Sequence, residues 1–499
     1  MSPMDNQTEM PANGFATPKE PTNSKRPFRI VIVGGGVAGL ALSHALTRVH
    51  IDHVVLEKGV VAPDWGASIS LWGNGSRILS QIGCLEALEA AALPLKMLHV
   101  RGPSGKAYNQ GAYFEMMRDR SGYESLTMER REFLRIIYRE HPEKNHIREH
   151  ARVVDIVDGP EDITVKLEDG STEVGDLVVG CDGVHSIVRE LMWRNANATI
   201  PNYIRAEEKQ SLITSYKSLV GVAKAIPGLG IRDMHWVTHH KLSFLILTQP
   251  DKIYFFVNWK LPQQTRWPTK SKWSTDAADA AAASVLDLPI SDSAVFGELW
   301  KNKLRAHLIG LEEGTFEHWH FGRVALVGDS VHKVTPNFAL GANCALESSA
   351  ALLNQVHRLL SETEPDSKPS KAAISEALER YQQVREPRQR DAASASALLT
   401  RLQAWDGPLN YLIMRYVWPL TGQGVYADLL AELCAGAPRF EFLPMVYTRP
   451  ATYKWRDDPN HAATPYANSA ITRHAAPALD LTSVELIVVL ACMVFSCLL

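Results

Sequence analysis

Three glycines near the N-terminus have the spacing that binds the phosphates of a dinucleotide. Gly34, Gly36 and Gly39 come directly after the apolar run Ile30–Val33 and open a segment with helical periodicity. The first glycine makes a tight turn, the second lets the backbone approach a pyrophosphate, and the third lets the helix pack closely on the strand. Free N–H groups at the helix N-terminus also favour an anion. The segment therefore predicts a dinucleotide site.

An acidic residue completes this motif about 20 residues further along. Val54–Leu56 is a second apolar strand, and it ends at Glu57. The carboxylate of Glu57 can accept hydrogen bonds from a ribose hydroxyl. A glycine-rich turn alone is weak evidence, because such turns are common. The order strand, turn, helix, strand and acid favours a dinucleotide site over a purely structural turn.

Two further strand ends carry an aspartate beside a glycine. Asp182 follows the apolar strand Leu177–Gly180, and Asp329 follows the apolar strand Val324–Val327. A carboxylate such as Asp329 can bind a ribityl hydroxyl, and N–H groups of the helix that follows can face a flavin oxygen or a phosphate. Taken singly, such dipeptides are mostly turns. Their order and spacing after the glycine loop indicate one shared site.

Length and composition indicate a globular protein of two or three domains. The 499 residues are 45% hydrophobic and 21% charged, and the formal net charge is -3. This charge gives no electrostatic signature of a nucleic-acid-binding protein. The six cysteines are scattered, without a C-x-x-C pair or metal-ligand spacing. We therefore expect free thiols in a reducing compartment and no metal site.

Strands and helices alternate around these motifs. Residues 199–319 are strand-rich, with alternating hydrophobicity in Ser243–Leu247 and an alanine-rich helical insert at Ser274–Leu286. Leu346–Leu360 and Ile374–Leu402 have helical periodicity. A strand-rich region therefore separates the two parts of the chain that carry the dinucleotide motifs.

The two ends of the chain differ from the middle. Residues 1–27 are polar and rich in Pro, Ser and Thr, which is typical of a disordered leader. Leu486–Leu499 is uncharged and apolar, which indicates a membrane anchor or a buried terminal helix. The aromatic-rich stretch Leu409–Leu420 is typical of a membrane interface or of a protein core. Together these features favour association with a membrane surface.

The glycine loop, the D-G motif and the G-D motif together resemble the class A FAD-dependent monooxygenases, over about Phe28 to Leu402. Several segments look most like the fungal monooxygenases that epoxidise prenyl chains in meroterpenoid and indole-diterpene biosynthesis: Glu57-Lys58, Trp65–Ser70, Asn74–Leu79, Met128–Leu134 and Thr335–Ser348. Ser70 stands where many relatives have Gly.

The pattern and the resemblance together imply an α/β fold. It would contain a Rossmann-type FAD-binding domain, an inserted β-sheet substrate domain and a helical C-terminal region. The expected boundaries are a leader over 1–27, FAD-binding parts over 28–198 and 320–402, a substrate domain over 199–319, a helical region over 403–480 and an anchor over 481–499.

The resemblance also implies roles at the cofactor. Glu57 would bind the adenosine ribose, and Ser70 would lie near the flavin. Arg130, or Arg131 if the register is shifted by one, would hold the adenine-side pyrophosphate or ribose. Asp329 would bind the ribityl chain or the pyrophosphate.

Further roles fall on the two aspartate motifs. Asp182 would belong to the cofactor site, and Arg189 in the same segment would contact phosphates of both FAD and NADPH. Pro336 would shape the pocket over the flavin. The backbone N–H of Ala342 would face the isoalloxazine edge.

The candidate catalytic residues are Tyr216, on a strand expected to face the substrate, and, upstream of it, Arg205. Tyr216 resembles the position of a catalytic tyrosine in relatives. The alternative is a tyrosine packed in the sheet with its hydroxyl satisfied.

The resemblance implies that FAD carries the chemistry, with NADPH as reductant and O₂ as the oxygen source. The protein would bind a lipophilic small molecule, exclude water and allow the flavin to move. Three functions follow: an epoxidase of a prenylated intermediate, a hydroxylase of a phenol or benzoate, and a non-catalytic carrier of prenyl groups. An anchored enzyme would lie on the endoplasmic reticulum and face the cytosol.

Overall fold

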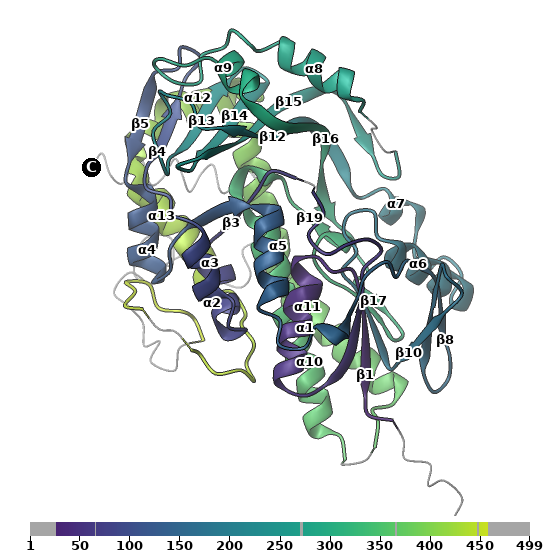
Figure 1. Cartoon of the computed structure of the whole chain (residues 1–499). Helices are drawn as coiled ribbons and strands as arrows, with labels where there is room; N and C mark the ends of the chain where they lie inside the picture. Colours follow the sequence, from purple (N-terminus) through teal and green to yellow (C-terminus); the bar gives the residue numbers. More distant parts are fainter. Residues whose placement is uncertain (1–25, 65, 270–272, 365–366, 447–448, 458–499) are drawn as a thin grey trace, which may run out of the picture.

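Two β-sheets of six and eight strands dominate the fold (Figure 1). The structure, a computed structural model, describes residues 26–64, 66–269, 273–364, 367–446 and 449–457. One sheet is parallel and lies among helices, and the other is mostly antiparallel. The expected α/β class, with a Rossmann-type part and a β-sheet part, is confirmed.

The six-stranded sheet carries the three motifs at one edge. Its strand order is β17-β18-β11-β1-β2-β7, parallel except for β17. The carboxyl ends of neighbouring parallel strands meet at one edge, so Gly34, Asp182 and Asp329 lie together there. The strands are β1 Arg29–Val33, β2 Asp52–Leu56, β7 Ile147–Arg148, β11 Leu177–Gly180, β17 His320–Phe321 and β18 Val324–Leu326.

The eight-stranded sheet draws strands from three parts of the chain. Strand β4 pairs in parallel with β13, although β4 and β5 precede the strand-rich region by about a hundred residues. Strand β19 joins the segment after Asp329 to the other edge. In sheet order the strands are β19 His332–Lys333, β16 Lys303–Thr315, β12 Ile213–Lys224, β15 Lys252–Arg266, β14 Leu242–Thr248, β13 Met234–His239, β4 Leu98–Arg101 and β5 Ala107–Gly111.

The two faces of this sheet pack against different helices (Figure 1). The outer face packs on α8 (Thr275–Ala283) and α9 (Phe296–Lys301), through residues such as Leu219 and Phe255. The inner face packs on α11 (Lys371–Gln403) and α13 (Trp418–Ala435). Since side chains alternate along each strand, every second residue faces the cofactor part of the molecule.

The remaining helices connect or cover the sheets. Helix α1 (Val37–Arg48) follows the glycine loop and packs on α10 (Leu340–Glu362). The other elements are β3 Ser68–Leu71, α2 Gly73–Gln81, α3 Leu85–Ala91, α4 Tyr113–Ser121, β6 Leu126–Glu129, α5 Arg130–Arg139, η1 Lys144–His146, β8 Val153–Asp158, β9 Ile163–Leu167, β10 Thr172–Gly175, α6 Ile187–Thr199, α7 Ala206–Lys209, η2 Gly328–Ser330, η3 Pro336–Phe338, α12 Pro408–Leu412 and a π-helical turn Ile413–Val417.

We correct the expectation of a membrane-associated protein at the endoplasmic reticulum, with a membrane surface as partner. Among the described residues, no helix is both long enough and apolar enough to cross a membrane. The two longest helices, α10 and α11, carry ionisable side chains such as Glu347 and Arg385 in their interior turns. Leu409–Leu420 buries Trp418 on one side and exposes Leu420 on the other. The run over 481–499 and the leader over 1–25 lie outside the described residues.

Candidate functional site

The glycine loop leaves room for a ligand at one position and none at the other two. A Cβ atom at Gly36 would have nothing within 4 Å, at the N-cap of α1. A Cβ atom at Gly34 would lie 2.5 Å from the carbonyl oxygen of Cys181, and Gly34 has φ +108°. A Cβ atom at Gly39 would lie 1.9 Å from the carbonyl oxygen of Gly34. Gly34 and Gly39 therefore fix the turn, and Gly36 leaves open space beside free helix N–H groups, which suits a pyrophosphate.

The carboxylate of Glu57 lies directly beside the glycine loop. It accepts hydrogen bonds from the N–H of Gly35 at 2.8 Å and from the N–H of Gly59 at 3.0 Å. These bonds hold the carboxylate at the end of β2. A ribose placed on the loop would meet this carboxylate first.

Asp182 lies on the other side of the glycine loop. One carboxylate oxygen accepts from the N–H groups of Ile187 and Val188, at 2.7 and 3.1 Å, and so caps α6. The other oxygen is buried and has no hydrogen-bond partner among the described residues. Burial raises the pKa of this carboxyl group. A buried acceptor without a partner is costly, so this oxygen suits a ligand donor.

Arg130 and Asp329 lie within electrostatic reach of each other. Burial lowers the pKa of Arg130, while the carboxylates of Asp329 and Glu57 oppose that shift. Asp329 forms an ion pair with Lys333, four residues further along. Arg131 points elsewhere and lies 3.6 Å from Asp64. Of the two consecutive arginines, Arg130 is the one that the structure brings to the other predicted cofactor residues.

Ser70 and Ala342 are brought together by an asparagine. Asn343 donates to the carbonyl oxygen of Ser70 at 3.1 Å and accepts from the N–H of Trp72 at 3.1 Å. The hydroxyl of Ser70 bonds to Thr127 at 2.8 Å. Ala342 lies in the first turn of α10, where backbone N–H groups have no partner within the helix. The first turn of α10 is therefore fixed beside the end of β3.

Arg189 is placed differently from the expected phosphate contact. Its side chain is buried, and its guanidinium donates to the carbonyl oxygens of Ser330 and Val184 at 2.7 and 3.0 Å. The arginine therefore ties the segment after β11 to the segment after β18. A ligand phosphate would have to displace these bonds to reach it.

Tyr216 is buried, and its hydroxyl is engaged. It donates to a carboxylate oxygen of Asp406 at 2.8 Å, and Lys260 donates to the same oxygen at 2.6 Å. Burial raises the pKa of the Tyr216 phenol well above its usual value, and the Asp406 carboxylate adds to this shift. The hydroxyl thus connects the sheet to the loop after α11.

The structure does not bring Arg205 together with the other predicted site residues. Arg205 lies at the N-cap of α7, its side chain is 63% exposed, and it pairs with Glu317 at 2.9 Å. The sheet positions that face the cofactor residues are instead occupied by apolar side chains: Val220, Val222, Met234, Trp236, Leu245, Leu247 and Tyr254. They form one cluster with Trp72, Leu340 and Trp418.

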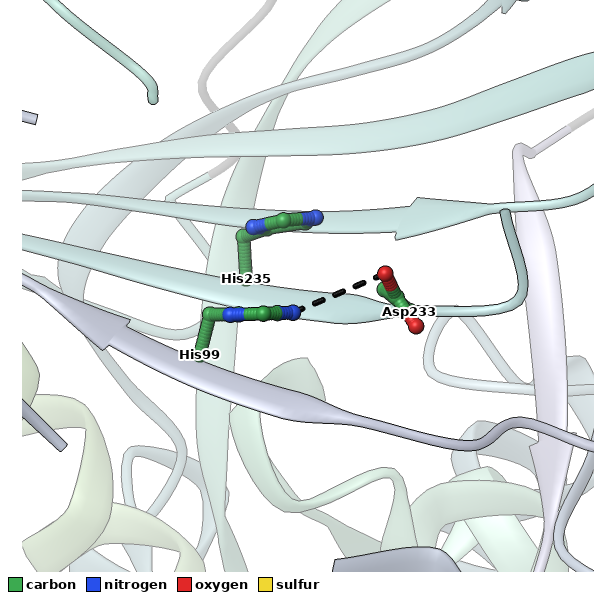
Figure 2. Close-up of side chains that lie close together, drawn as sticks. All are labelled: His99, Asp233 and His235. Carbon is green, nitrogen blue, oxygen red and sulfur yellow. Dashed lines mark ion pairs between the residues drawn. The ribbon is translucent and has the colours of Figure 1, made fainter. Parts of the chain in front are cut away.

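A group of metal-ligating side chains lies on the outer face of the same sheet (Figure 2). The rings of His99 and His235 are stacked, with centroids 4.7 Å apart, and His99 lies 3.5 Å from Asp233. Stacked rings direct their lone pairs side by side, whereas a metal needs ligands that converge. Arg101 donates to Nδ1 of His235 at 3.2 Å, so Nε2 carries the proton that goes to the carbonyl oxygen of Leu229 at 2.7 Å. The group is a hydrogen-bonded network between strands.

Two residues of the site could not be predicted from the sequence motifs. Lys333 pairs with Asp329, and its only sequence signal is its place four residues after that aspartate. Asn343 bridges β3 and α10 and lies within the segment Thr335–Ser348 that carries the family resemblance. The bridge made by Asn343 depends on contact between distant segments, which the local sequence does not encode.

Comparison with known proteins finds relatives that are FAD-dependent monooxygenases. The chain is 42% identical to the FAD-dependent monooxygenase DEP2 of Alternaria brassicicola, over 87% of this chain and 83% of DEP2. It is 35% identical to the FAD-dependent monooxygenase penE of Penicillium thymicola, over 84% of this chain and 88% of penE. It is 33% identical to the FAD-dependent monooxygenase atmM of Aspergillus flavus, over 89% of this chain and 92% of atmM.

Solved structures share the fold. HpxO of Klebsiella pneumoniae, complexed with FAD and uric acid, superposes with a TM-score of 0.65 at 20% identity, over 82% of this chain and 97% of HpxO. CtdE in complex with FAD and a substrate superposes with a TM-score of 0.62 at 18% identity, over 82% of this chain and 98% of CtdE. The FAD binding domain family matches residues 28–396. The chain therefore belongs to this family and is an FAD-dependent monooxygenase.

Proposed function

We propose that the protein uses NADPH and O₂ to epoxidise a double bond in the prenyl chain of a terpenoid or meroterpenoid. When bound, FAD supplies the redox chemistry that transfers one oxygen atom from O₂ to the substrate. The protein would hold the cofactor, place the double bond against it and keep water away.

The cofactor would be held by the residues at the edge of the six-stranded sheet. Gly36 would admit the pyrophosphate, Glu57 would bind the adenosine ribose, and Arg130 would lie against the phosphates or this ribose. The free oxygen of Asp182 would accept a hydrogen bond from the cofactor. Support comes from the open space at Gly36 and from the buried acceptor of Asp182.

The flavin end would lie at the first turn of α10. Asp329 would accept hydrogen bonds from the ribityl chain, and the N–H of Ala342 would face the isoalloxazine edge. Ser70 would lie beside the ring, at the position that Asn343 connects to α10. The ion pair between Lys333 and Asp329 keeps a positive charge at this end of the site.

The apolar inner face of the eight-stranded sheet carries the substrate proposal. Residues directly opposite each other on neighbouring strands share a face, and Val220, Phe256 and Leu245 form such a row across three strands. The next row, Val222, Tyr254 and Leu247, is apolar apart from one phenol hydroxyl. These side chains now pack on Trp72, Leu340 and Trp418, so a prenyl chain would replace some of these contacts and bury its own surface at a gain of about 25 cal/mol per Å².

The cations at the rim of this face are already paired, which disfavours the hydroxylation of an anionic phenol or benzoate. Arg305 and Lys252 both pair with Glu129, at 2.5 and 3.2 Å. Lys260 pairs with Asp406 at 2.6 Å. A benzoate placed on this face would have to break one of these pairs.

A substrate panel tests the proposal. The FAD-loaded protein is incubated with O₂ and NADPH, or with NADH, and with a prenylated phenol or indole, each beside its unprenylated parent. Mass spectrometry should show one added oxygen on the prenyl fragment, and the parents should remain unchanged. Oxygen in the aromatic ring would establish hydroxylation instead. A protein that neither oxidises NADPH nor adds oxygen to any prenylated compound would contradict the proposal.

A further inference from the structure

An arginine-lined cavity lies between α11 and the end of α13, outside the site described above. It has a volume of about 390 Å³. Arg385 and Arg388 reach it from α11, and Arg439 and Arg456 reach it from the segment after α13. The turn around Gly436 forms one wall. So many guanidinium groups around one space indicate a site for an anion.

A buried carboxylate balances part of this positive charge. Arg385 and Arg388 share Glu347, at 3.1 and 2.7 Å. Burial opposes ionisation of Glu347, but the two guanidinium groups lower its pKa to about 2. This carboxylate therefore stays charged at neutral pH and is shared by two cations.

The arginines outside helix α11 also outnumber their carboxylate partners. Arg439 and Arg77 share Asp457, each at 2.7 Å, and Arg456 pairs with Glu432 at 2.5 Å. Glu441 also lines the cavity and pairs with Arg358 at 3.7 Å. Among the described residues of this network, six guanidinium groups therefore meet four carboxylates, which leaves an excess of two positive charges.

Two guanidinium nitrogens converge on the same point of the cavity wall. A Cβ atom at Gly436 would lie 3.3 Å from Nη1 of Arg388 and 3.3 Å from Nη1 of Arg456. The ion pairs use other atoms: Nε and Nη2 of Arg388, and Nη2 of Arg456. Both Nη1 atoms lie beside the same glycine, so an anion at this wall of the cavity would be within reach of both.

We propose that this cavity binds a dianionic phosphate group. A phosphate monoester carries about two negative charges at neutral pH, which matches the excess positive charge. Guanidinium groups bind phosphate oxygens through paired N–H donors. Two sources share this chemistry: the 2′-phosphate of NADPH, and a phosphate ester that binds separately from the electron donor. The site is distinct from the glycine loop, where the FAD pyrophosphate would bind.

Arg456 is the best position for a test, because its side chain is 61% exposed and its carboxylate partner among the described residues is the exposed Glu432. Changing Arg388 would leave the buried Glu347 with one partner fewer and could unfold the protein. Arg152 is a matched control: its side chain is 52% exposed and it pairs with Glu168 at 3.3 Å, outside the cavity lining.

The experiment titrates the FAD-loaded full chain with inorganic phosphate, and separately with 2′,5′-ADP, by calorimetry in phosphate-free buffer. We expect saturable binding that Arg456→Gln weakens about tenfold and that Arg152→Gln leaves unchanged. Arg439→Gln, a second change in the cavity lining, should weaken binding similarly. Each variant is first checked for wild-type flavin content and thermal unfolding.

The reductant separates the two sources. If the 2′-phosphate is the ligand, Arg456→Gln raises the Kd for NADPH in rapid flavin reduction and leaves the Kd for NADH unchanged. If a separate phosphate ester is the ligand, phosphate binding weakens but both reductants behave as in the wild type. Either result supports the anion site. Wild-type protein that binds neither inorganic phosphate nor 2′,5′-ADP would overturn it, as would folded Arg456→Gln and Arg439→Gln variants with wild-type affinity.

Discussion

Arg189 donates a 2.7 Å hydrogen bond from its guanidinium to the carbonyl oxygen of Ser330. This bond joins the segment that carries Asp182 to the segment that carries Asp329. Burial lowers the pKa of Arg189 to about 10, so the group remains charged at neutral pH. Three aromatic rings surround it: Trp193, Trp267 and Phe316, with centroids 5.2, 5.1 and 4.5 Å from the guanidinium carbon. Arg189 therefore fixes the relative position of the two aspartate motifs from behind the site.

Arg189→Met should lower both stability and FAD affinity. The variant leaves the carbonyl oxygens of Ser330 and Val184 without a charged donor, at a cost of about 2–3 kcal/mol. Arg194→Met on the same helix is the control, since Arg194 is exposed and pairs with Asp155. Urea unfolding and a flavin titration measure the two effects. Equal stability of the two variants would show that the bond to Ser330 contributes nothing.

Gly36→Val should abolish FAD binding without unfolding the apoprotein. Its Cβ meets no atom within 4 Å, so the added side chain fills only the space proposed for the pyrophosphate. Gly39→Val should instead destabilise the fold, because its Cβ would overlap the carbonyl oxygen of Gly34 at 1.9 Å. Flavin content and circular dichroism separate the two outcomes. Flavin retained by Gly36→Val would place the pyrophosphate elsewhere.

Arg130→Ala should weaken FAD binding, and Arg131→Ala should not. Arg130 lies within electrostatic reach of Asp329 and Glu57, whereas Arg131 faces Asp64 at 3.6 Å. We expect Arg130→Ala to lose about 1.5–3 kcal/mol of FAD affinity, as for other hydrogen bonds to charged groups. Fluorescence titration of each apoprotein with FAD measures this. The reverse order would shift the register of the site by one residue.

The sequence predicted the parts of the site that depend on local pattern. The glycine loop, Glu57 and the two aspartates follow apolar strands, and parallel strands bring their carboxyl ends together by geometry. The alternating stretch Ser243–Leu247 also lies in a strand, β14, as expected. These elements need only neighbouring residues to specify them.

Contacts between distant segments could not be predicted in the same way. Strand β4 joins β13 in the large sheet because its residues Leu98 and Val100 complete the inner apolar cluster. Arg189 lies inward, among the rings of Trp193 on its own helix and of Trp267 and Phe316 from two other segments. Of the two apolar runs behind the membrane expectation, Leu409–Leu420 divides between the core and the surface, and 481–499 lies outside the described residues. Pattern alone does not say which face an apolar residue meets.

Asp329→Ala should cost about 1–3 kcal/mol of FAD affinity and preserve the fold, because ribityl hydroxyls would lose their acceptor. Asp155→Ala is the control, since Asp155 is paired with Arg194 at the surface. The flavin itself should be released by trichloroacetic acid from the wild type, as expected of a noncovalent cofactor. A variant with wild-type flavin content and turnover would remove Asp329 from the site.

Tyr216→Phe distinguishes a catalytic tyrosine from a structural one. The hydroxyl donates to Asp406, which Lys260 also engages, so we expect a loss of about 1 kcal/mol in stability. Turnover and the ratio of product formed to NADPH oxidised should stay within about twofold of the wild type, because a structural hydroxyl transfers no proton. A general acid or base would contribute about 10²–10⁴-fold to the rate. Because the pKa of the phenol is raised, wild-type turnover should show no loss from Tyr216 ionisation up to its unperturbed pKa of about 10. A loss of turnover by two orders of magnitude at unchanged flavin content would instead make Tyr216 catalytic.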